Sequence, residues 1–417
     1  MQRDLFGKPI KEKFIGLEWL RFFLGIFIMM YHTLHTYSDY TKFTHYISDL
    51  GFVATSCFFI LSGFLLTHVY LDWNKENITI REPAKYFWIK RFSNLYPIHI
   101  GSLIFFIAVV LLINQMGVLS YDADYSIRNV TFDVNKPIDH NLITHQMSYL
   151  ETGFVFVLNL FLLQSWNPYY LSFNLPAWSI STLFFFYFTF PYIAPRLAKI
   201  KKPFMAIVIN NITYLIPVTL VILFTAHDMP ETGMLHRNPL FRLPEFILGI
   251  LLCVIYHRRK DSHKTTPNYM SYFFILVFAI SMAFATMILK QFGNVGYYLL
   301  HNGLLMIPEG LIIYAFAVLK FDYGPKMNKF ATTLGGSSLP MFALHIPIFM
   351  LFVRFERILS GDPLSCFQSW QSCVETAGDK SIVFYPLYML LTIIVCIYFQ
   401  KYFVVYFREK IKSKMIH

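Results

Sequence analysis

The stretch EWLRFFLGIFIMMYH at residues 18–32 is almost wholly apolar, yet it carries Glu18, Arg21 and His32. Apolar runs of similar length recur along the chain, from Ile15 to Phe407. A bilayer core about 30 Å thick is crossed by a helix of roughly 20 apolar residues. The sequence therefore predicts an all-α polytopic membrane protein whose first span contains three ionisable side chains.

The composition argues against a soluble protein. Of the 417 residues, 56% are hydrophobic and 14% are charged, which leaves too few charges to coat a globule. The net charge of +11 does not indicate a nucleic-acid partner, because Lys and Arg lie in short loops between the apolar runs, where they orient a membrane protein. We expect one transmembrane domain, residues 1–417, surrounded by the lipid bilayer.

The apolar runs predict about ten spans. We expect them near residues 15–37, 49–71, 96–116, 177–196, 204–225, 239–257, 269–289, 296–319, 330–353 and 382–407. The segment 152–165 is apolar but short, which favours a re-entrant or interfacial piece. The run 81–97 suits an amphipathic helix on the inner leaflet.

The basic loops orient the chain. Lys and Arg gather in the N-terminal tail and in 72–92, 196–202, 257–264, 320–329 and 408–414, whereas 38–48, 117–150, 226–236 and 354–381 are acidic or mixed. This alternation works only if 152–165 does not cross, and it then places both termini in the cytoplasm. Cys366 and Cys373 would lie outside, which favours a disulfide over two free thiols.

Charged and polar groups in the first span share one helix face. Arg21 and His32 are eleven residues apart, so they lie within roughly 20° of each other and roughly 16 Å apart along the axis. Glu18 is placed to pair with Arg21, and His35 continues the stripe. The alternative to a functional role for this stripe is a structural salt bridge. A guanidinium suits phosphate and an imidazole can take a proton, which together suit a long acyl-coenzyme A donor.

Six segments carry a family resemblance. Arg21 and His32 reproduce the R-x10-H signature of the acyltransferase family 3 membrane proteins. The other segments that resemble the family, in its order, are CFFILSGFLL at 57–66, KRFSNLYPIHI at 90–100, NLPAWSISTLFFFY at 174–187, FRLPEFILGILL at 241–252 and SSLPMFALHIPI at 337–348. The resemblance runs through most of the chain.

The resemblance implies an activity. Family members move an acyl group, commonly acetyl, from cytoplasmic coenzyme A to an acceptor that is often a glycan hydroxyl outside. It implies a base or acyl-relay role for His32 and an orienting role for Arg21. We therefore expect an O-acyltransferase of the bacterial inner (plasma) membrane that acts on a polysaccharide, lipopolysaccharide or lipid-linked saccharide. Acetyl-coenzyme A would be a substrate, with no permanently bound cofactor.

Further candidate residues have structural alternatives. We expect donor binding at Arg91, Lys90 and Ser62, and additional site residues at Trp178, Ser179, Ser181, Arg242, Glu245 and His345. The alternatives are close helix approach at Ser62, a membrane anchor at Arg91, N-capping at the serines, a simple ion pair for Arg242 with Glu245, and packing at His345. His99, Asn302 and Glu309 have weaker claims. We expect no metal, because His and carboxylates do not cluster at ligand spacing.

Two positions depart from the family pattern. Asn94 stands where the family has a second arginine, and Leu183 stands where it has an acidic residue. Three other functions stay open at this stage: a transporter with an intramembrane Arg/Glu/His path, an acyltransferase for a small-molecule or lipid acceptor, and a member that has lost activity.

Overall fold

The computed structural model describes residues 13–37, 50–73, 77–115, 127–132, 144–225, 229–262, 267–319 and 323–416. Most of the N-terminal basic tail, the expected outer loop 38–48 and most of 117–150 lie outside these residues. The helical elements are α1 (Ile15–Thr33), η1 (Leu34–Thr36), α3 (Phe52–Tyr70), α4 (Ala84–Gln115), α6 (Tyr149–Leu160), η3 (Gln164–Trp166), η4 (Leu175–Ala177), α7 (Trp178–Ala198), α8 (Pro203–Phe224), α9 (Glu231–Arg237), α10 (Pro239–Asp261), α11 (Asn268–Leu299), η5 (Leu300–Leu304), α12 (Met306–Val318), α13 (Pro325–Ser360), η6 (Pro363–Phe367), α14 (Trp370–Glu375), η7 (Ile382–Phe384), α15 (Tyr385–Tyr398), η8 (Phe399–Val404) and α16 (Val405–Ile416).

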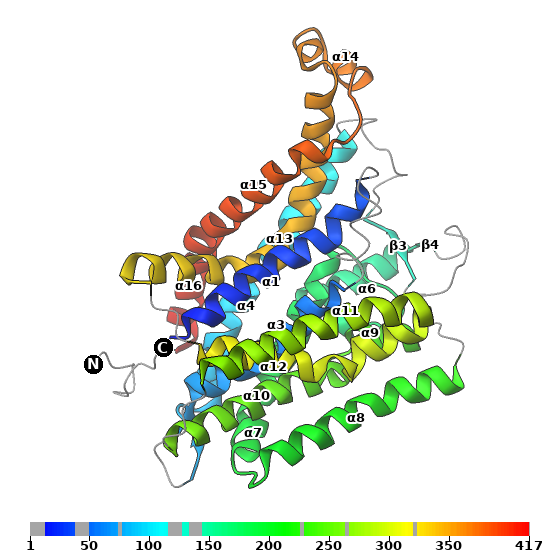
Figure 1. Cartoon of the computed structure of the whole chain (residues 1–417). Helices are drawn as coiled ribbons and strands as arrows, with labels where there is room; N and C mark the ends of the chain where they lie inside the picture. The colour runs from blue at the N-terminus through cyan, green and yellow to red at the C-terminus, as the bar shows by residue number, and fades with distance from the viewer. Residues whose placement is uncertain are drawn as a thin grey trace.

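The described part of the chain forms a helical membrane bundle, as the sequence predicts (Figure 1). Nine of its helices are long and apolar enough to cross a membrane. Strands are limited to two small antiparallel pairs, β1 (Leu71–Asp72) with β2 (Thr79–Ile80) and β3 (Asn129–Thr131) with β4 (Thr144–Gln146). The start of α1 and the end of α16 lie on the same side of the molecule in Figure 1, as expected for termini that share a compartment.

One of the expected spans is not a continuous helix. The expected eighth span, 296–319, consists of the end of α11, the π-helical turn η5 and the short helix α12. Gly303 has φ +128° and Asn302 has non-helical angles, so the helix is broken there. α12 has 13 residues and is about 20 Å long, too short to cross alone. This segment is a discontinuous helix inside the bundle.

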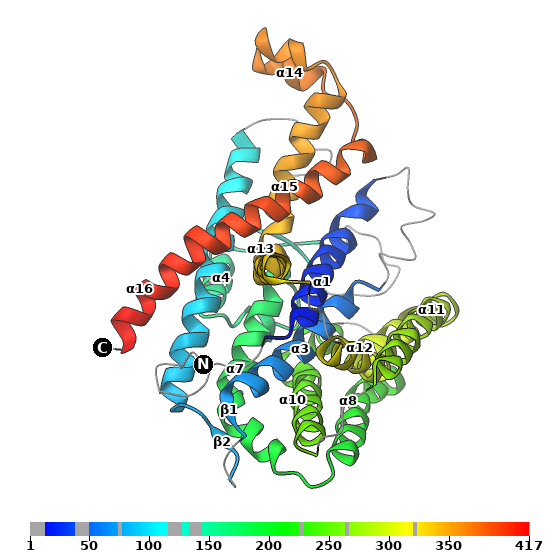
Figure 2. The ribbon, with the colours of Figure 1, turned by 60° about the vertical axis from the view of Figure 1, so that its left-hand side comes forward.

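The run 81–97 is not a separate helix. α4 runs without interruption from Ala84 to Gln115, with Pro97 inside it. One helix therefore joins the expected interfacial run to the expected span 96–116. Neighbouring helices α7, α13 and α16 pack against α4 (Figure 2), and such packing lets a membrane helix tolerate an internal proline.

The short apolar segment 152–165 does not form a spanning helix, as predicted. α6 has 12 residues, about 18 Å, and its start is fixed by a capping box between Ser148 and Glu151. Tyr170 donates to the Glu151 carboxylate at 2.5 Å and thereby lowers the pKa of that carboxyl. Near the C-terminal end of α6, the buried ring of His99 on α4 contacts the Asn159 carbonyl, Nε2 to O 2.7 Å. α6 is thus held against α4 rather than across the membrane.

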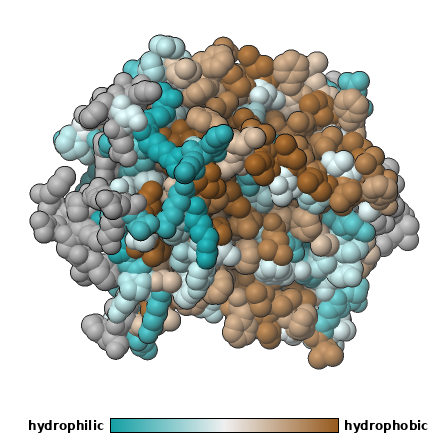
Figure 3. Space-filling view, turned by 90° about the horizontal axis from the view of Figure 1, so that it is seen from below, coloured by the Kyte–Doolittle hydropathy of each residue, from teal (hydrophilic) through white to brown (hydrophobic). Residues whose placement is uncertain are grey.

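The centre of the bundle is α3, and its outside is apolar. In the most apolar window of each helix, 83% of residues are buried in α3, against 11% in α8 and 6% in α11. α8 exposes a stripe of large side chains at helical spacing: Phe204, Val208, Ile212, Ile216, Leu220 and Leu223. Broad hydrophobic areas are visible when the molecule is seen from below (Figure 3). These surfaces are suited to contact with lipid.

Close backbone contact holds α3 against α10. A Cβ on Gly63 would lie 2.1 Å from the Phe246 carbonyl oxygen, and a Cβ on Gly249 would lie 1.9 Å from that of Ile60. Only glycine allows this approach, so the close helix approach considered at Ser62 occurs at its neighbour Gly63.

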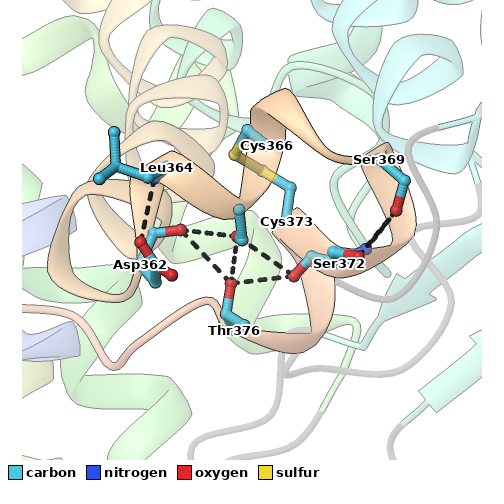
Figure 4. Close-up of a disulfide and its surroundings, with 8 residues drawn as sticks. Asp362, Leu364, Cys366, Ser369, Ser372, Cys373 and Thr376 are labelled. Atoms are coloured by element: carbon cyan, nitrogen blue, oxygen red, sulfur yellow. Dashed lines mark hydrogen bonds between the residues drawn. A yellow bond between two sulfur atoms is a disulfide. The ribbon is translucent and has the colours of Figure 1, made fainter.

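Cys366 and Cys373 form a disulfide in the projecting segment made of η6 and α14 (Figure 4). Around it, Ser365 Oγ donates to the Asp362 carbonyl at 2.6 Å, and Thr376 Oγ1 donates to the Ser372 carbonyl at 2.9 Å. The remaining cysteines, Cys57, Cys253 and Cys396, are buried in the bundle.

Candidate active site

A pair of histidines joins α1 to α13. His32 Nδ1 lies 2.9 Å from His345 Nε2, and the two rings are stacked with centroids 5.0 Å apart and planes 15° apart. His32 is in the last turn of α1, and His345 is in the apolar centre of α13. The structure thus brings together two of the sequence candidates that are 313 residues apart.

The hydrogen bonds of this pair determine its tautomers. His345 Nδ1 lies 2.8 Å from the Met341 carbonyl oxygen, which can only accept, so this nitrogen carries the proton. In neutral His345, Nε2 is then an acceptor, and it receives the Nδ1–H of His32. His32 Nε2 is left with a free lone pair. A proton acceptor or nucleophile at this position is therefore the Nε2 atom of His32.

The two histidines differ in access. His345 is fully buried, whereas His32 keeps partial exposure. The Tyr31 ring lies beside His32, with centroids 4.7 Å apart. Of the two rings, only that of His32 is partly exposed, and His345 lies against its Nδ1 side.

Arg21 lies toward the other end of α1. Its Nη1 is 3.3 Å from Glu18 Oε2, which confirms the expected pairing. The side chain of Arg21 stays 24% exposed, so the ion pair does not enclose it. The Glu18 carboxylate lies against Gly335 on α13, the same helix that carries His345. α1 and α13 thus share both the cationic end and the histidine end of this face.

A second cation approaches Arg21 from α4. Arg91 donates to the Tyr70 hydroxyl, and its guanidinium lies 4.8 Å from the Tyr70 ring centroid. Arg91 and Arg21 both act electrostatically on Tyr187, whose hydroxyl bonds Ser62. Arg91 Nε is buried without a hydrogen-bond partner among the described residues. Arg21 and Arg91 are therefore both within electrostatic range of Tyr187.

Lys90 is not part of this group of cations. It forms a close ion pair with Glu82, which is 3% exposed. This pairing weakens the expected role of Lys90 in donor binding, because the neighbouring carboxylate already neutralises the ammonium. Asn94 itself is half-buried on the same helix.

A second polar cluster, separate from the His32–His345 pair, surrounds Arg242 on α10. Arg242 pairs with Glu245, Nη2 to Oε1 2.9 Å, and both are buried. The same guanidinium donates to Ser56 Oγ at 2.9 Å and to His301 Nδ1 at 2.7 Å. Tyr214 donates to Glu245 at 3.1 Å. This is more than the simple pair that spacing predicts, since groups from four helical elements meet there.

The broken helix makes this cluster possible. Because η5 is not α-helical, the His301 carbonyl is free to accept from Arg242 Nη1 at 3.1 Å. Irregular backbone at membrane depth needs such partners. Glu309, in the first turn of α12, is buried within electrostatic range of Arg242 and Glu245.

His236 lies near both clusters. Its ring lies 5.4 Å from the His301 ring and 5.1 Å from the Trp178 ring, and it is within electrostatic range of His32. Polar groups therefore extend from His345 through His32 and His236 to His301 and Arg242.

Comparison with known proteins identifies the family of the chain. Residues 14–401 match the model of the family described as the acyltransferase domain. The chain belongs to acyltransferase family 3. Acyltransferase MdmB of Streptomyces mycarofaciens is 30% identical over 228 residues, which are 50% of this chain and 48% of that relative. The chain thus matches about half the length of this curated relative, and no solved structure is similar to it.

Several expected site residues of this family 3 member contact backbone carbonyls. Ser179 donates to the Pro176 carbonyl at 2.9 Å, and Ser181 donates to the Leu162 carbonyl at 2.6 Å. Neither caps α7, whose N-cap is Ala177. His35 is exposed beyond the end of α1, with Nδ1 3.2 Å from the Tyr31 carbonyl, so it does not join the histidine pair.

The acidic position of the family is apolar here. Leu183 is 3% exposed and packs with Phe59, Trp178 and Phe186. Neither possible stand-in replaces it, because Glu151 belongs to the α6 cap and Glu245 is bound to Arg242.

Sequence reasoning missed His236, His301 and Tyr187 as members of the polar clusters. His236 lies in the short helix α9, outside any apolar run. His301 begins the sequence HNG, and an asparagine–glycine pair inside an apolar run is the signal that indicates a broken helix. Tyr187 is one of many aromatic residues in its segment, and nothing in the sequence distinguishes it.

Proposed function

We propose that this protein is an integral-membrane O-acyltransferase that moves an acyl group from cytoplasmic acyl-coenzyme A to a hydroxyl of a cell-envelope or exported glycan. Acetyl is the simplest acyl group for this role. The observation that carries the proposal is the tautomer of the His32–His345 pair, which leaves the lone pair of His32 Nε2 available on the more accessible side.

Two cations, Arg21 on α1 and Arg91 on α4, support a phosphorylated donor. Both are within electrostatic range of Tyr187, and each has N–H groups that suit phosphate. The eleven-residue separation places Arg21 roughly 16 Å from His32 along the helix. An acyl-coenzyme A is long enough to have its phosphates at the arginines and its thioester near the imidazole.

The reaction can follow two routes at His32. In direct transfer, Nε2 takes the acceptor hydroxyl proton while the oxygen attacks the thioester carbon; the C–O bond forms, the C–S bond breaks, and the proton passes to the thiolate. In relay transfer, Nε2 attacks the thioester carbon and the C–S bond breaks, which releases the coenzyme A thiolate. The acceptor oxygen then attacks the acyl carbon, the N–C bond breaks, and the hydroxyl proton passes to the thiolate. In both routes His345 accepts the Nδ1–H of His32 and holds the ring in place.

The test is acetyl-coenzyme A turnover by purified protein in proteoliposomes. His32→Ala should lower turnover by about 10² to 10⁴, the range for loss of an acid–base group. His99→Gln is the matched control, because His99 is also a buried intramembrane histidine bound to a carbonyl. Arg21→Lys should raise the KM for the donor, since lysine lacks the bidentate fork. Full turnover by the His32 variant would refute the proposal.

The acceptor needs a separate experiment. Mass spectrometry of envelope polysaccharide and lipopolysaccharide, with and without the gene, should show loss of an O-acetyl group. Unchanged glycans with an altered small molecule or lipid would support the acceptor alternatives. Family membership supports an enzyme over a transporter, although the discontinuous helix at η5 is a feature that transporters also use.

A further inference from the structure

Two histidines and a cysteine meet at the end of the bundle opposite to the histidine pair. His68 is in the last turn of α3, and Cys253 and His257 are one turn apart on α10. All three are buried, and one potential ligand atom from each lies within 4.8 Å of the others. His68 Nδ1 is 3.1 Å from His257 Nε2. The expectation that no metal-ligand cluster exists considered only histidines and carboxylates, so it did not include this thiol.

The spacing suits a tetrahedral zinc ion. Zinc binds imidazole nitrogen at about 2.0–2.1 Å and thiolate sulfur at about 2.3 Å. Two nitrogens on one tetrahedral zinc ion are then about 3.3 Å apart, close to the 3.1 Å between His68 and His257. Cys253 and His257 are at i and i+4, so their side chains lie on the same face of α10.

The surroundings hold the histidine rings in place. Trp73 stacks on His257 with centroids 4.0 Å apart and planes 9° apart. The Phe14 ring lies 4.6 Å from the His68 ring. Phe14 is the N-cap residue of α1, and Trp73 follows β1. Ring orientation is therefore fixed before any ion binds, which lowers the cost of forming the site.

We propose that His68, Cys253 and His257 bind one zinc ion that joins the ends of α3 and α10. The ion would bind His68 Nδ1, His257 Nε2 and the Cys253 sulfur, with water as the fourth ligand. The Cys253 S–H proton is released to solvent on binding, and both imidazoles bind in neutral form. This site is separate from the His32–His345 pair and does not depend on the acyltransferase proposal.

The test measures zinc in the purified full-length protein after the affinity tag is removed. Wild type should retain about one zinc per chain through dialysis, and Cys253→Ser should retain less than a tenth of that. Cys396→Ser is the matched control, because Cys396 is also fully buried and lies in a different apolar cluster. Cobalt added to chelator-treated wild type should give thiolate-to-metal absorption that Cys253→Ser lacks.

A stability measurement covers a variant that folds poorly. Zinc returned to chelator-treated wild type should raise its Tm, and the same addition should not raise the Tm of His257→Gln. The proposal is overturned if wild type holds no more zinc than Cys253→Ser, if Cys396→Ser loses zinc equally, or if zinc leaves the wild-type Tm unchanged.

Discussion

The Met341 carbonyl, through His345, determines which nitrogen of His32 can react. The sequence places His32 and Arg21 on one face of α1, but it does not show that His345 lies 2.9 Å away. A lone histidine in an apolar helix is usually a packing residue. Here the Nδ1–H of His345 donates to a carbonyl, so only its Nε2 can accept a hydrogen bond from the His32 ring.

We predict that His345→Ala lowers kcat by about 10- to 100-fold without changing the KM for acyl-coenzyme A, because the ring of His32 loses its orienting acceptor. His345→Gln should recover part of the loss, since its amide oxygen can accept the same N–H. Steady-state kinetics of the two variants provides the measurement. Equal defects in both, with a lower folded yield, would instead indicate a packing role.

At the scale of elements, glycines determine how closely the helices approach. Gly63 and Gly249 let α3 and α10 touch along their backbones, and this contact positions Ser56 next to Arg242. The same pairing brings His68 to His257 at the other end of the two helices. Residue spacing in α10 predicts the pair of Arg242 with Glu245. The other partners of Arg242, which come from α3 and η5, follow only from the packing.

Gly249→Ala should destabilise the protein by about 1–3 kcal/mol, because the new Cβ would lie 1.9 Å from the Ile60 carbonyl oxygen and the helices would have to separate. Gly153→Ala is the control: it is on the exposed face of α6 with nothing within 4 Å of a new Cβ, and alanine favours the helix there. Thermal unfolding in detergent compares the two. A Tm for Gly249→Ala equal to that of wild type would contradict the close contact.

The whole molecule has a predicted orientation, with the donor side facing the cytoplasm. Gln146 on β4 and Ser413 on α16 are both exposed. In the predicted orientation they face opposite sides of the membrane. The native cysteines are buried or joined in a disulfide, so they give little background labelling.

In intact cells, a membrane-impermeant maleimide should label Gln146→Cys, whereas Ser413→Cys should react only after permeabilisation. The physical reason is the excess of Lys and Arg in the loops on the Ser413 side. Gel-shift of the labelled protein reads out both variants. The opposite pattern would reverse the direction of acyl transfer.

The sequence alone determined the membrane class, most of the spans, the short α6 segment and the α1 face with Arg21 and His32, because hydropathy and helical periodicity are local properties. Tertiary structure decided the His32–His345 pair, the broken helix at η5 and the cluster of His68 with Cys253 and His257. These depend on which helices become neighbours, and residues far apart in the chain leave no local pattern of their contact. Where a glycine and an asparagine break α-helical geometry, polar side chains of α8 and α10 hydrogen-bond the freed carbonyls of His301 and Gly303, and only packing could supply them.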